Sequence, residues 1–473
     1  MQSIIDELPK EFSRNLENRK VICIQGLGFV GAAMCAVVSN SLDENGENYK
    51  VIGVDLDGER VQSINDGSFP INTNDPAMDE AIKRATSGGN LVATEKPDFY
   101  SIADIVVMDI NCDLIEDEKG KWVNLETIEK ATASIAKRIK QECLLIVETT
   151  VPPGTCEKII LPILSKEFSQ RGLDNSKIKL AHSYERVMPG KDYYDSIQNC
   201  WRVYSGLNQE SSELCKKFLT TIINTKEFPL TELSNLKASE TAKVLENSFR
   251  AANIAFIDEW SRFAESIGVN LFEVIDAIKV RPTHKNIMLP GFGVGGYCLT
   301  KDPYFAKFSA HEIFNNKELD FPFSDLLLQV NKEMPLSTFE TLRNYFQGDL
   351  ANKKVLLLGV SYREEVADTR YSASEIFYKE VKKHDVDIKC LDPLVEYWEE
   401  TDVKPFRALP DDNDFDALIF SVRHSEFEDY NFEKWLDGKK PLIIDANNVL
   451  NSKNIEFYKS LGCNVRAIGR GDL

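Results

Sequence analysis

The chain has 473 residues, of which 43% are apolar and 28% charged, and its formal net charge is −19. This composition is that of an ordinary folded protein, and the length predicts two or three domains. The acidic balance argues against nucleic acid as a partner, because phosphates favour basic surfaces. No apolar run reaches the ~18 residues that a membrane helix needs, and the acidic start Met1–Leu8 lacks signal-peptide features. We therefore expect a cytoplasmic protein that does not enter a membrane.

The ten cysteines are scattered without CxxC pairs, and none of the five histidines lies at metal-ligand spacing from another. In a chain without a secretory signal, such cysteines are expected to be reduced thiols rather than a disulfide or zinc framework. The sequence therefore predicts no metal site, and it offers few histidines for catalysis.

A dinucleotide-binding pattern lies near the N-terminus. The apolar run 21–24 is followed by Gly26, Gly28 and Gly31 in the spacing GxGxxG, and then by a helical segment, 32–39. Strand, glycine turn and helix in this order place a pyrophosphate against a helix N-terminus. The pattern predicts a dinucleotide site.

Polar residues at the ends of later strands add candidates on the cofactor side. The second strand ends in Asp55, whose carboxylate is expected to accept from the adenosine ribose and so favours NAD over NADP. Arg60, a turn further on, tempers this choice because an arginine there can contact a phosphate. Thr150 follows a buried strand and is either a cofactor contact or a helix cap. Glu185 follows another strand and is expected in the same crevice.

A long helix is predicted from about 240 to 267. Apolar residues lie nearly all round it, so we expect a buried helix that joins two domains and packs against a second subunit. Lys243 and Asn247 lie four residues apart on one face. A lysine in so apolar a helix either has a partner or a task, or its ammonium reaches solvent.

A second α/β pattern begins after residue 335. It lacks the full glycine fingerprint, so it predicts a nucleotide-binding fold of another geometry. Its strand-like runs are 353–360, 388–393, 417–421 and 441–445. We predict an α/β protein with two Rossmann-like domains joined by a long central helix.

The segment Pro290–Asp302 gathers glycines around one cysteine. Four glycines lie within positions 291–296, and Cys298 is followed closely by Lys301 and Asp302. Glycines let a backbone approach a ligand, and a thiol near a positive charge becomes the nucleophilic thiolate. The segment also satisfies GxGxxG but has no preceding strand, so we predict a loop that presents a reactive cysteine to a substrate. The alternative is a surface turn with a buried structural cysteine.

Six motifs in order resemble the UDP-glucose/GDP-mannose 6-dehydrogenase family along nearly the whole chain after residue 19. They are the glycine turn with Asp55, Thr149–Pro152, Lys243 with Asn247, Gly293–Asp302, Asn331 with Met334–Pro335, and Asp368–Arg370. The resemblance implies an NAD-dependent four-electron oxidation of a nucleotide-sugar C6 alcohol to a carboxylate, by a homodimer joined through the central helix. It implies an NAD domain over 1–225, a helical domain with the cysteine loop over 226–335, and a nucleotide-sugar domain over 336–473.

The same resemblance implies catalytic roles. Cys298 matches the residue that forms thiohemiacetal and thioester intermediates, and Lys243 matches a lysine that stabilises the oxyanion. Asn247 and Asp302 match polar partners that position water and assist proton transfer. Glu185 matches an acid that serves aldehyde oxidation or thioester hydrolysis.

Ligand contacts also follow from the resemblance. The matches on the cofactor side are Gly26, Gly28, Gly31, Asp55, Arg60, Thr150 and Arg370. Those on the substrate side are Phe292, Gly293, Gly295, Arg363, Arg186 and Arg281, the last reaching across the dimer at a spacing one residue longer than in the family.

Departures from the family pattern narrow the substrate. The stretch Glu185–Gly190 has Pro189 where other branches carry a second acid, and it resembles the UDP-N-acetylhexosamine branch. Ile110–Asp113 replaces a Val-x-Thr-Pro turn, and Asn447–Asn448 replaces an arginine. The leading interpretation is a UDP-N-acetylhexosamine 6-dehydrogenase that makes a uronate for a surface polysaccharide. The alternatives are the same chemistry on UDP-glucose, a non-catalytic nucleotide-binding protein, and a generic cysteine aldehyde dehydrogenase that forms one NADH per turnover.

Overall fold

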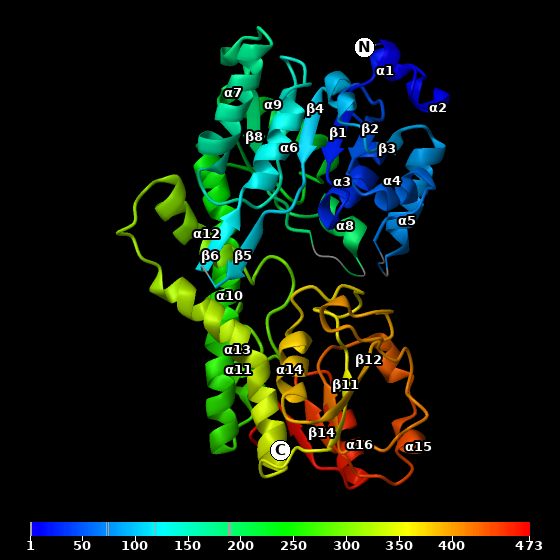
Figure 1. Cartoon of the computed structure of the whole chain (residues 1–473), viewed down its shortest axis with the longest axis vertical. Helices are drawn as coiled ribbons and strands as arrows, with labels where there is room; N and C mark the ends of the chain where they lie inside the picture. The colour runs from blue at the N-terminus through cyan, green and yellow to red at the C-terminus, as the bar shows by residue number, and fades with distance from the viewer. Residues whose placement is uncertain (1, 72, 74, 119, 188–189, 191) are drawn as a thin grey trace. The chain divides into compact units, whose positions relative to one another are not determined.

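The structure is a computed structural model, and it describes residues 2–71, 73, 75–118, 120–187, 190 and 192–473. The chain forms two compact units (Figure 1). One consists of Met1–Leu245 with Tyr304–Asp320, and the other of Glu246–Pro303 with Phe321–Leu473. The expected division at 225 and 335 stays a prediction.

The first unit is built on an eight-stranded sheet with the order β10-β9-β8-β7-β4-β1-β2-β3. The strands are β1 (Val21–Gln25), β2 (Lys50–Val54), β3 (Leu91–Thr94), β4 (Ile105–Met108), β7 (Leu144–Val147), β8 (Lys179–His182), β9 (Val203–Gly206) and β10 (Thr231–Glu232). All neighbours are parallel except β8 and β9. The strand order reverses between β1 and β4, and in such sheets the ligand crevice lies at that point, outside the carboxyl ends of the strands.

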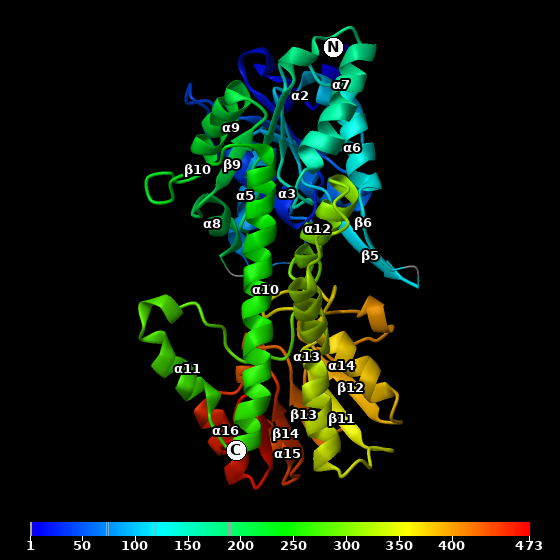
Figure 2. The ribbon, with the colours of Figure 1, turned by 90° about the vertical axis from the view of Figure 1, so that its left-hand side faces the viewer.

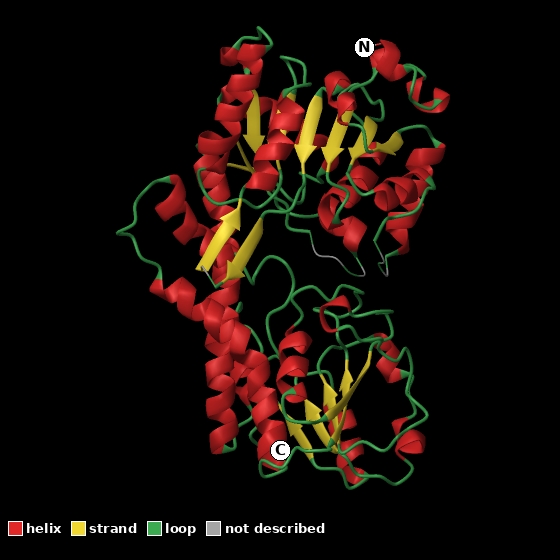
Figure 3. Cartoon of the chain, in the orientation of Figure 1, coloured by secondary structure: helices red, strands yellow, loops and turns green. Residues whose placement is uncertain are grey.

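Helices cover both faces of this sheet (Figure 3). They are α3 (Phe29–Asn40), α4 (Gly58–Asn65), α5 (Pro76–Ser87), α6 (Glu126–Ala136), α7 (Leu161–Gln170), α8 (Tyr193–Gln198) and α9 (Gln209–Ile222). Successive residues of a strand point to opposite faces. Ile22 and Ile24 of β1 accordingly join one apolar core, and Cys23 joins the other. The N-terminal extension contributes to the second core through Phe12 and Leu16, near α1 (Gln2–Ile5) and α2 (Lys10–Ser13).

A hairpin of β5 (Asp113–Asp117) and β6 (Gly120–Asn124) stands where the family pattern has a Val-x-Thr-Pro turn. Its backbone accepts a hydrogen bond at the Lys121 carbonyl from the Tyr304 hydroxyl, at 2.7 Å. Tyr304 belongs to α12 (Asp302–Phe308). The hairpin therefore anchors the part of α12 that lies in the first unit.

The second unit contains a five-stranded, fully parallel sheet in the order β12-β11-β13-β14-β15. Its strands are β11 (Lys354–Leu358), β12 (Asp387–Leu391), β13 (Ala417–Phe420), β14 (Leu442–Asp445) and β15 (Val465–Ala467), and its helices are α11 (Leu271–Lys279), α13 (Pro322–Tyr345), α14 (Ala373–Lys382), α15 (Phe432–Leu436) and α16 (Ser452–Ser460). Four of the five strands were predicted from apolar runs. The expectation of an α/β protein with two Rossmann-like domains and a long central helix is confirmed.

That long helix, α10, spans Leu236–Ile267 (Figure 2). The expectation that it is buried nearly all round is wrong for this single chain. Six large apolar side chains on it are 45–64% exposed, namely Leu245, Phe249, Phe256, Trp260, Phe263 and Ile267. Their spacings of three, four and seven place them on one face of the helix. Across the described residues, no helix is long and apolar enough to cross a membrane.

Candidate active site

The glycine turn after β1 has the backbone that the dinucleotide pattern requires. Gly26 has a φ of +93°, and a Cβ on it would lie 2.0 Å from the Asp109 carbonyl oxygen. A Cβ on Gly31 would lie 1.9 Å from the carbonyl oxygen of Gly26, so the helix could not approach the turn so closely with any other residue. At Gly28, the N-cap of α3, a Cβ would meet open space. A pyrophosphate fits that space, because the N–H groups at a helix N-terminus favour an anion there.

Asp55 directly follows β2, as expected for the ribose partner. Its Oδ2 accepts from the backbone N–H of Leu27 in the glycine turn. Arg60 pairs with Asp57 at 3.2 Å and with Asp55 at 3.9 Å, so its guanidinium already has acidic partners. Leu56, beside Asp55, is 94% exposed. Composition and spacing alone gave no signal for Leu56, since exposure is a tertiary property.

Thr150 and Thr149 lie in the turn after β7. The Thr149 hydroxyl donates to the Ile110 carbonyl oxygen at 2.8 Å, and the Ile110 N–H donates to that hydroxyl at 2.9 Å. Thr149 thus fixes the chain after β4, a role that sequence reasoning missed. Thr150 is partly exposed beside it, and its contact with NAD stays a prediction.

Lys243 and Glu185 are brought together in the first unit. The Lys243 ammonium donates to the Glu185 carbonyl oxygen at 2.7 Å and lies 3.7 Å from its carboxylate. Both side chains are nearly buried, at 7% and 13% exposure. The alternative of a lysine reaching solvent is therefore wrong, and the lysine has the partner that its burial requires.

His182, at the end of β8, lies beside this pair. Its Nδ1 is 2.6 Å from the Ser239 hydroxyl of α10. Burial, followed by the charge of Lys243, lowers the pKa of His182 to about 3. The ring is therefore neutral near pH 7 and does not compete with Lys243 as a cation.

In the second unit, Asp302 is the centre of a buried polar network. Its Oδ2 accepts from Asn247 Nδ2 at 2.6 Å, and its Oδ1 accepts from Lys301 Nζ at 2.8 Å. Its backbone N–H donates to the Cys298 carbonyl oxygen at 2.9 Å. These bonds fix the turn that carries the partly exposed Cys298, so the alternative of a buried structural cysteine does not hold for Cys298.

The glycines before Cys298 are required by the protein's own packing. A Cβ on Gly293 would lie 2.6 Å from Ala373 Cβ, and one on Gly295 would lie 2.9 Å from both the Tyr362 side chain and the Tyr371 carbonyl oxygen. A Cβ on Gly296 would lie 2.8 Å from the Tyr362 ring. Whether the loop also cradles a substrate stays a prediction. No motif pointed to Tyr362, whose contact with the loop exists only in the folded unit.

Phe292 begins this loop as a buried anchor. Its ring packs against Phe377, with centroids 5.7 Å apart, and its N–H donates to Asn447 Oδ1 at 3.1 Å. Asn447 occupies the position where the family pattern has an arginine. In this chain the residue binds the backbone of the cysteine loop rather than offering a charge.

The arginines proposed as ligand contacts lie in different settings. The Arg370 guanidinium makes two hydrogen bonds with Asp368, at 2.9 and 2.7 Å. Arg186 stacks 5.3 Å from the Tyr184 ring, Arg363 is partly exposed, and Arg281 is exposed before a short 3₁₀ turn. Their ligand roles stay predictions. The substrate argument from Pro189 falls on a residue outside those described.

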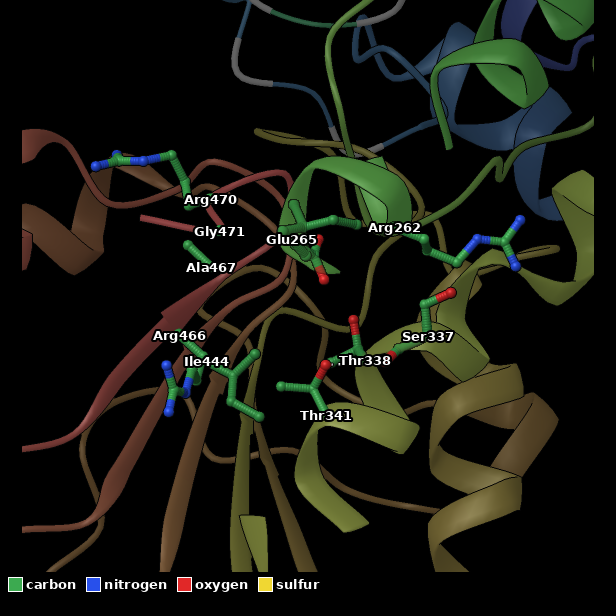
Figure 4. Close-up of a pocket in the computed structure, with 11 residues that line it drawn as sticks. Arg262, Glu265, Ser337, Thr338, Thr341, Ile444, Arg466, Ala467, Arg470 and Gly471 are labelled. Carbon is green, nitrogen blue, oxygen red and sulfur yellow. Dashed lines mark hydrogen bonds between the residues drawn. The ribbon is translucent and has the colours of Figure 1, made fainter. Parts of the chain in front are cut away.

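Two further features lie outside these groups. A cavity of about 110 Å³ is bordered by α10, α13 and the segment after β15, with Glu265 and Thr338 directed toward it (Figure 4). A second feature is a cluster of side chains that could bind a metal ion. Its ligand atoms lie within 4.8 Å of one another and belong to Glu365, His424 and Glu426. His424 already pairs with Asp392 at 3.3 Å.

Comparisons with known proteins agree along the chain. Profiles of the UDP-glucose/GDP-mannose dehydrogenase family match its NAD binding domain at 20–223, its central domain at 237–333 and its UDP binding domain at 356–452. The UDP-N-acetyl-D-mannosamine dehydrogenase of Methanocaldococcus jannaschii is 30% identical over 460 residues, 96% of this chain and 97% of that protein. The UDP-glucose 6-dehydrogenase of Rickettsia typhi is 26% identical, over 94% and 98%. A solved UDP-D-ManNAc dehydrogenase from Pyrococcus horikoshii has a TM-score of 0.79 at 26% identity, over 96% and 100%.

The glycine turn on a parallel sheet, together with the matched NAD domain, defines an NAD-dependent oxidoreductase. The chain belongs to the UDP-glucose/GDP-mannose dehydrogenase family and is a nucleotide-sugar dehydrogenase that acts on a UDP-sugar.

Proposed function

We propose that this chain oxidises the C6 alcohol of a UDP-N-acetylhexosamine to the uronate, and that UDP-N-acetyl-D-mannosamine is the substrate to test first. The names of the relatives from Methanocaldococcus jannaschii and Pyrococcus horikoshii support this substrate. The observation that carries the proposed chemistry is the turn that holds a partly exposed Cys298 by the buried Asp302, with Asn247 and Lys301 bound to that carboxylate.

NAD supplies the chemistry of hydride acceptance, which a four-electron oxidation requires twice. The C6 alcohol first loses a hydride and its hydroxyl proton to become the aldehyde. The Cys298 thiolate then adds to the aldehyde carbon, forming a C–S bond as the C=O π bond breaks and placing negative charge on the oxygen. Loss of hydride from this thiohemiacetal gives a thioester, which keeps the carbon at the acyl level. Water then cleaves the C–S bond, releasing the carboxylate and returning the thiol, with a proton lost to solvent.

Lys243 is proposed to stabilise the oxyanion, since a buried ammonium interacts strongly with developing charge. Its bond to the Glu185 carbonyl oxygen leaves two of its three N–H donors for other acceptors. Glu185 is proposed to assist aldehyde oxidation or to activate water for thioester hydrolysis. Asn247 and Asp302 are proposed to orient that water.

The experiment is a panel of UDP-sugars, with NADH and acid product counted for each. UDP-ManNAc, UDP-GlcNAc, UDP-GalNAc and UDP-glucose are compared at equal concentration. Two NADH per sugar with preference for an N-acetylated donor support the proposal. One NADH per sugar, or activity on free aldehydes alone, would show a simple aldehyde dehydrogenase instead.

UDP-glucose is the second candidate because the Rickettsia typhi relative carries that name. If the same panel shows a preference for UDP-glucose, UDP-glucose replaces the proposed substrate, and the proposed reaction mechanism is unaffected. A role in surface polysaccharide formation and a cytoplasmic location remain predictions.

We further propose a homodimer through α10. Its exposed apolar face runs along the helix from Leu245 to Ile267, with Phe256, Trp260 and Phe263 in ring contact. A continuous apolar stripe of this kind is costly in water and marks an interface. A second copy presents the same stripe, which a two-fold axis pairs with itself.

A further inference from the structure

Two carboxyl groups and an arginine lie near the carboxyl ends of strands in the first unit. Glu148 and Arg202 are buried, whereas Asp109 is partly exposed. Asp109 and Glu148 directly follow β4 and β7, neighbouring parallel strands whose last paired residues are Met108 and Val147. The Glu148 N–H donates to the Met108 carbonyl oxygen at 3.1 Å, and the Asp109 N–H donates to that of Gln25 at 2.8 Å. The two carboxyl groups therefore follow adjacent strands, of which β4 borders the point where the strand order reverses.

Asp109 and Glu148 lie near the half of the NAD site that is expected to hold the nicotinamide. Asp55, the expected ribose partner, follows β2 on one side of the glycine turn. Gly31 belongs to that turn, and a Cβ on it would lie 3.2 Å from Asp109 Cβ. Since the pyrophosphate binds at the turn, the remaining half of the cofactor extends over β4 and β7. Asp109 and Glu148 therefore underlie the nicotinamide half.

Two carboxyl oxygens here have no donor. The fully buried Arg202 pairs with Oε1 of Glu148. Oε2 of Glu148 and Oδ2 of Asp109 are both buried, and neither has a hydrogen-bond partner among the residues that the structure describes. Two neighbouring carboxylates that each have a buried oxygen cannot both be ionised without a large electrostatic cost, and a proton held between those oxygens removes that cost.

We propose that Asp109 and Glu148 share one proton between these two oxygens, so that with Arg202 they form an electrically neutral floor under the nicotinamide. Asp109 is thereby a positioning residue for the cofactor rather than a catalytic one. Burial, followed by the neighbouring Glu148 carboxylate, raises the pKa of Asp109 well above its usual range. The other titratable groups described as facing Asp109 are Glu185, Arg202 and Cys35.

The neutral floor has a measurable consequence, because the nicotinamide ring carries a positive charge in NAD⁺ and none in NADH. A change of one unit charge beneath the ring shifts the ratio of the two dissociation constants, by about tenfold at ~10 Å separation in a protein of moderate dielectric. Both carboxyl groups belong to the NAD-binding part of the chain, so this ratio does not depend on which UDP-sugar is oxidised.

Two isosteric variants, each losing one carboxyl group, separate the possibilities. Asp109→Asn keeps a neutral donor toward Glu148, so the ratio of NAD⁺ to NADH dissociation constants should stay within about twofold of the wild type. Glu148→Gln removes the second carboxylate, so Asp109 should ionise opposite Arg202 and the ratio should again stay within about twofold. The double variant Asp109→Asn/Glu148→Gln leaves Arg202 uncompensated, so NAD⁺ should weaken relative to NADH by about tenfold there, and adding Arg202→Met should reverse that shift. A tenfold shift in Asp109→Asn would mean that Asp109 is ionised and would overturn the proposal.

Infrared spectroscopy supplies a readout that does not depend on the Glu148 variants folding. The full-length wild type at neutral pH should show the carbonyl stretch of a buried protonated carboxylic acid, shifted by deuterium exchange. Asp109→Asn should lack that band. If no wild-type band disappears in the variant, the pair holds no shared proton and the proposal fails.

Discussion

Asn247 of α10 donates a 2.6 Å hydrogen bond to the fully buried carboxylate of Asp302, four residues after Cys298. The bond joins two segments of the second unit that are 55 residues apart in sequence. It makes the geometry of the cysteine turn depend on one amide of the long helix, so a change of that amide tests the site.

Asn247→Asp should lose most of the turnover and lower the stability. The new carboxylate would face Asp302 without a donor, and placing an unpaired charge in a buried network costs about 3–5 kcal/mol. Chemical unfolding and NADH formation measure the two effects. Asn253→Asp is the control, because Asn253 lies on the same helix with a largely exposed bond to the Asn286 carbonyl oxygen. Equal effects in both variants would contradict a special role for Asn247.

Cys298→Ser should abolish carboxylate formation while NAD still binds. A serine hydroxyl is a far weaker nucleophile than a thiolate and does not form the thioester. Acid product is measured by chromatography and NAD affinity by calorimetry. Cys200→Ser, a second partly exposed cysteine, should keep its activity. Undiminished acid from Cys298→Ser would exclude covalent catalysis by this residue.

Lys243→Met should slow the chemical step by about 10²–10³-fold, the usual effect of removing a group that stabilises an oxyanion. NAD affinity should change little. Rapid-quench single-turnover measurement isolates the step. Lys237→Met is a matched control on the same helix, where the lysine pairs with Glu157 at 2.7 Å and is 43% exposed. An unchanged single-turnover rate in Lys243→Met would remove Lys243 from the mechanism.

Because of His182, the free energy of unfolding should fall as the pH is lowered below about 6.5. Its pKa in the folded protein is about 3, below the ordinary value of 6.5, so only the unfolded chain takes up the proton between these values. Its contribution to the free energy of unfolding is complete above pH 6.5 and declines as pH falls, by about 1.5 kcal/mol between pH 6.5 and pH 5. Denaturant unfolding of wild type and His182→Gln over this range isolates the term. Equal slopes in the two proteins would contradict the prediction.

Trp260→Glu should dissociate the proposed dimer. A charge in the centre of the apolar face of α10 would be buried without a partner on association. Light scattering gives the mass of each protein. Phe406→Glu serves as the control, because Phe406 is also exposed, at 40%, but lies outside the α10 face. A monomeric wild type would refute the proposed assembly.

The sequence alone determined the two α/β domains, the glycine turn, the long helix and the candidates Lys243, Glu185, Asn247, Cys298 and Asp302. The domains, the turn and the helix follow from local patterns, because apolar periodicity and glycine spacing depend on neighbours in the chain. The catalytic roles expected of the five candidates were implied by the family resemblance. The prediction that α10 is buried nearly all round was wrong, because periodicity shows that a helix face is apolar but not what covers that face.

Only the tertiary structure decided which polar groups meet. Asn247 with Asp302, Lys243 with Glu185, and Asp109 with Glu148 are contacts between segments brought together by the fold, and no spacing in the sequence encodes them. Burial then sets the chemistry, because an unpaired charge costs far more inside a protein than in water. This cost favours the pairing of Lys243 with Glu185. It also favours a single proton shared between Asp109 and Glu148.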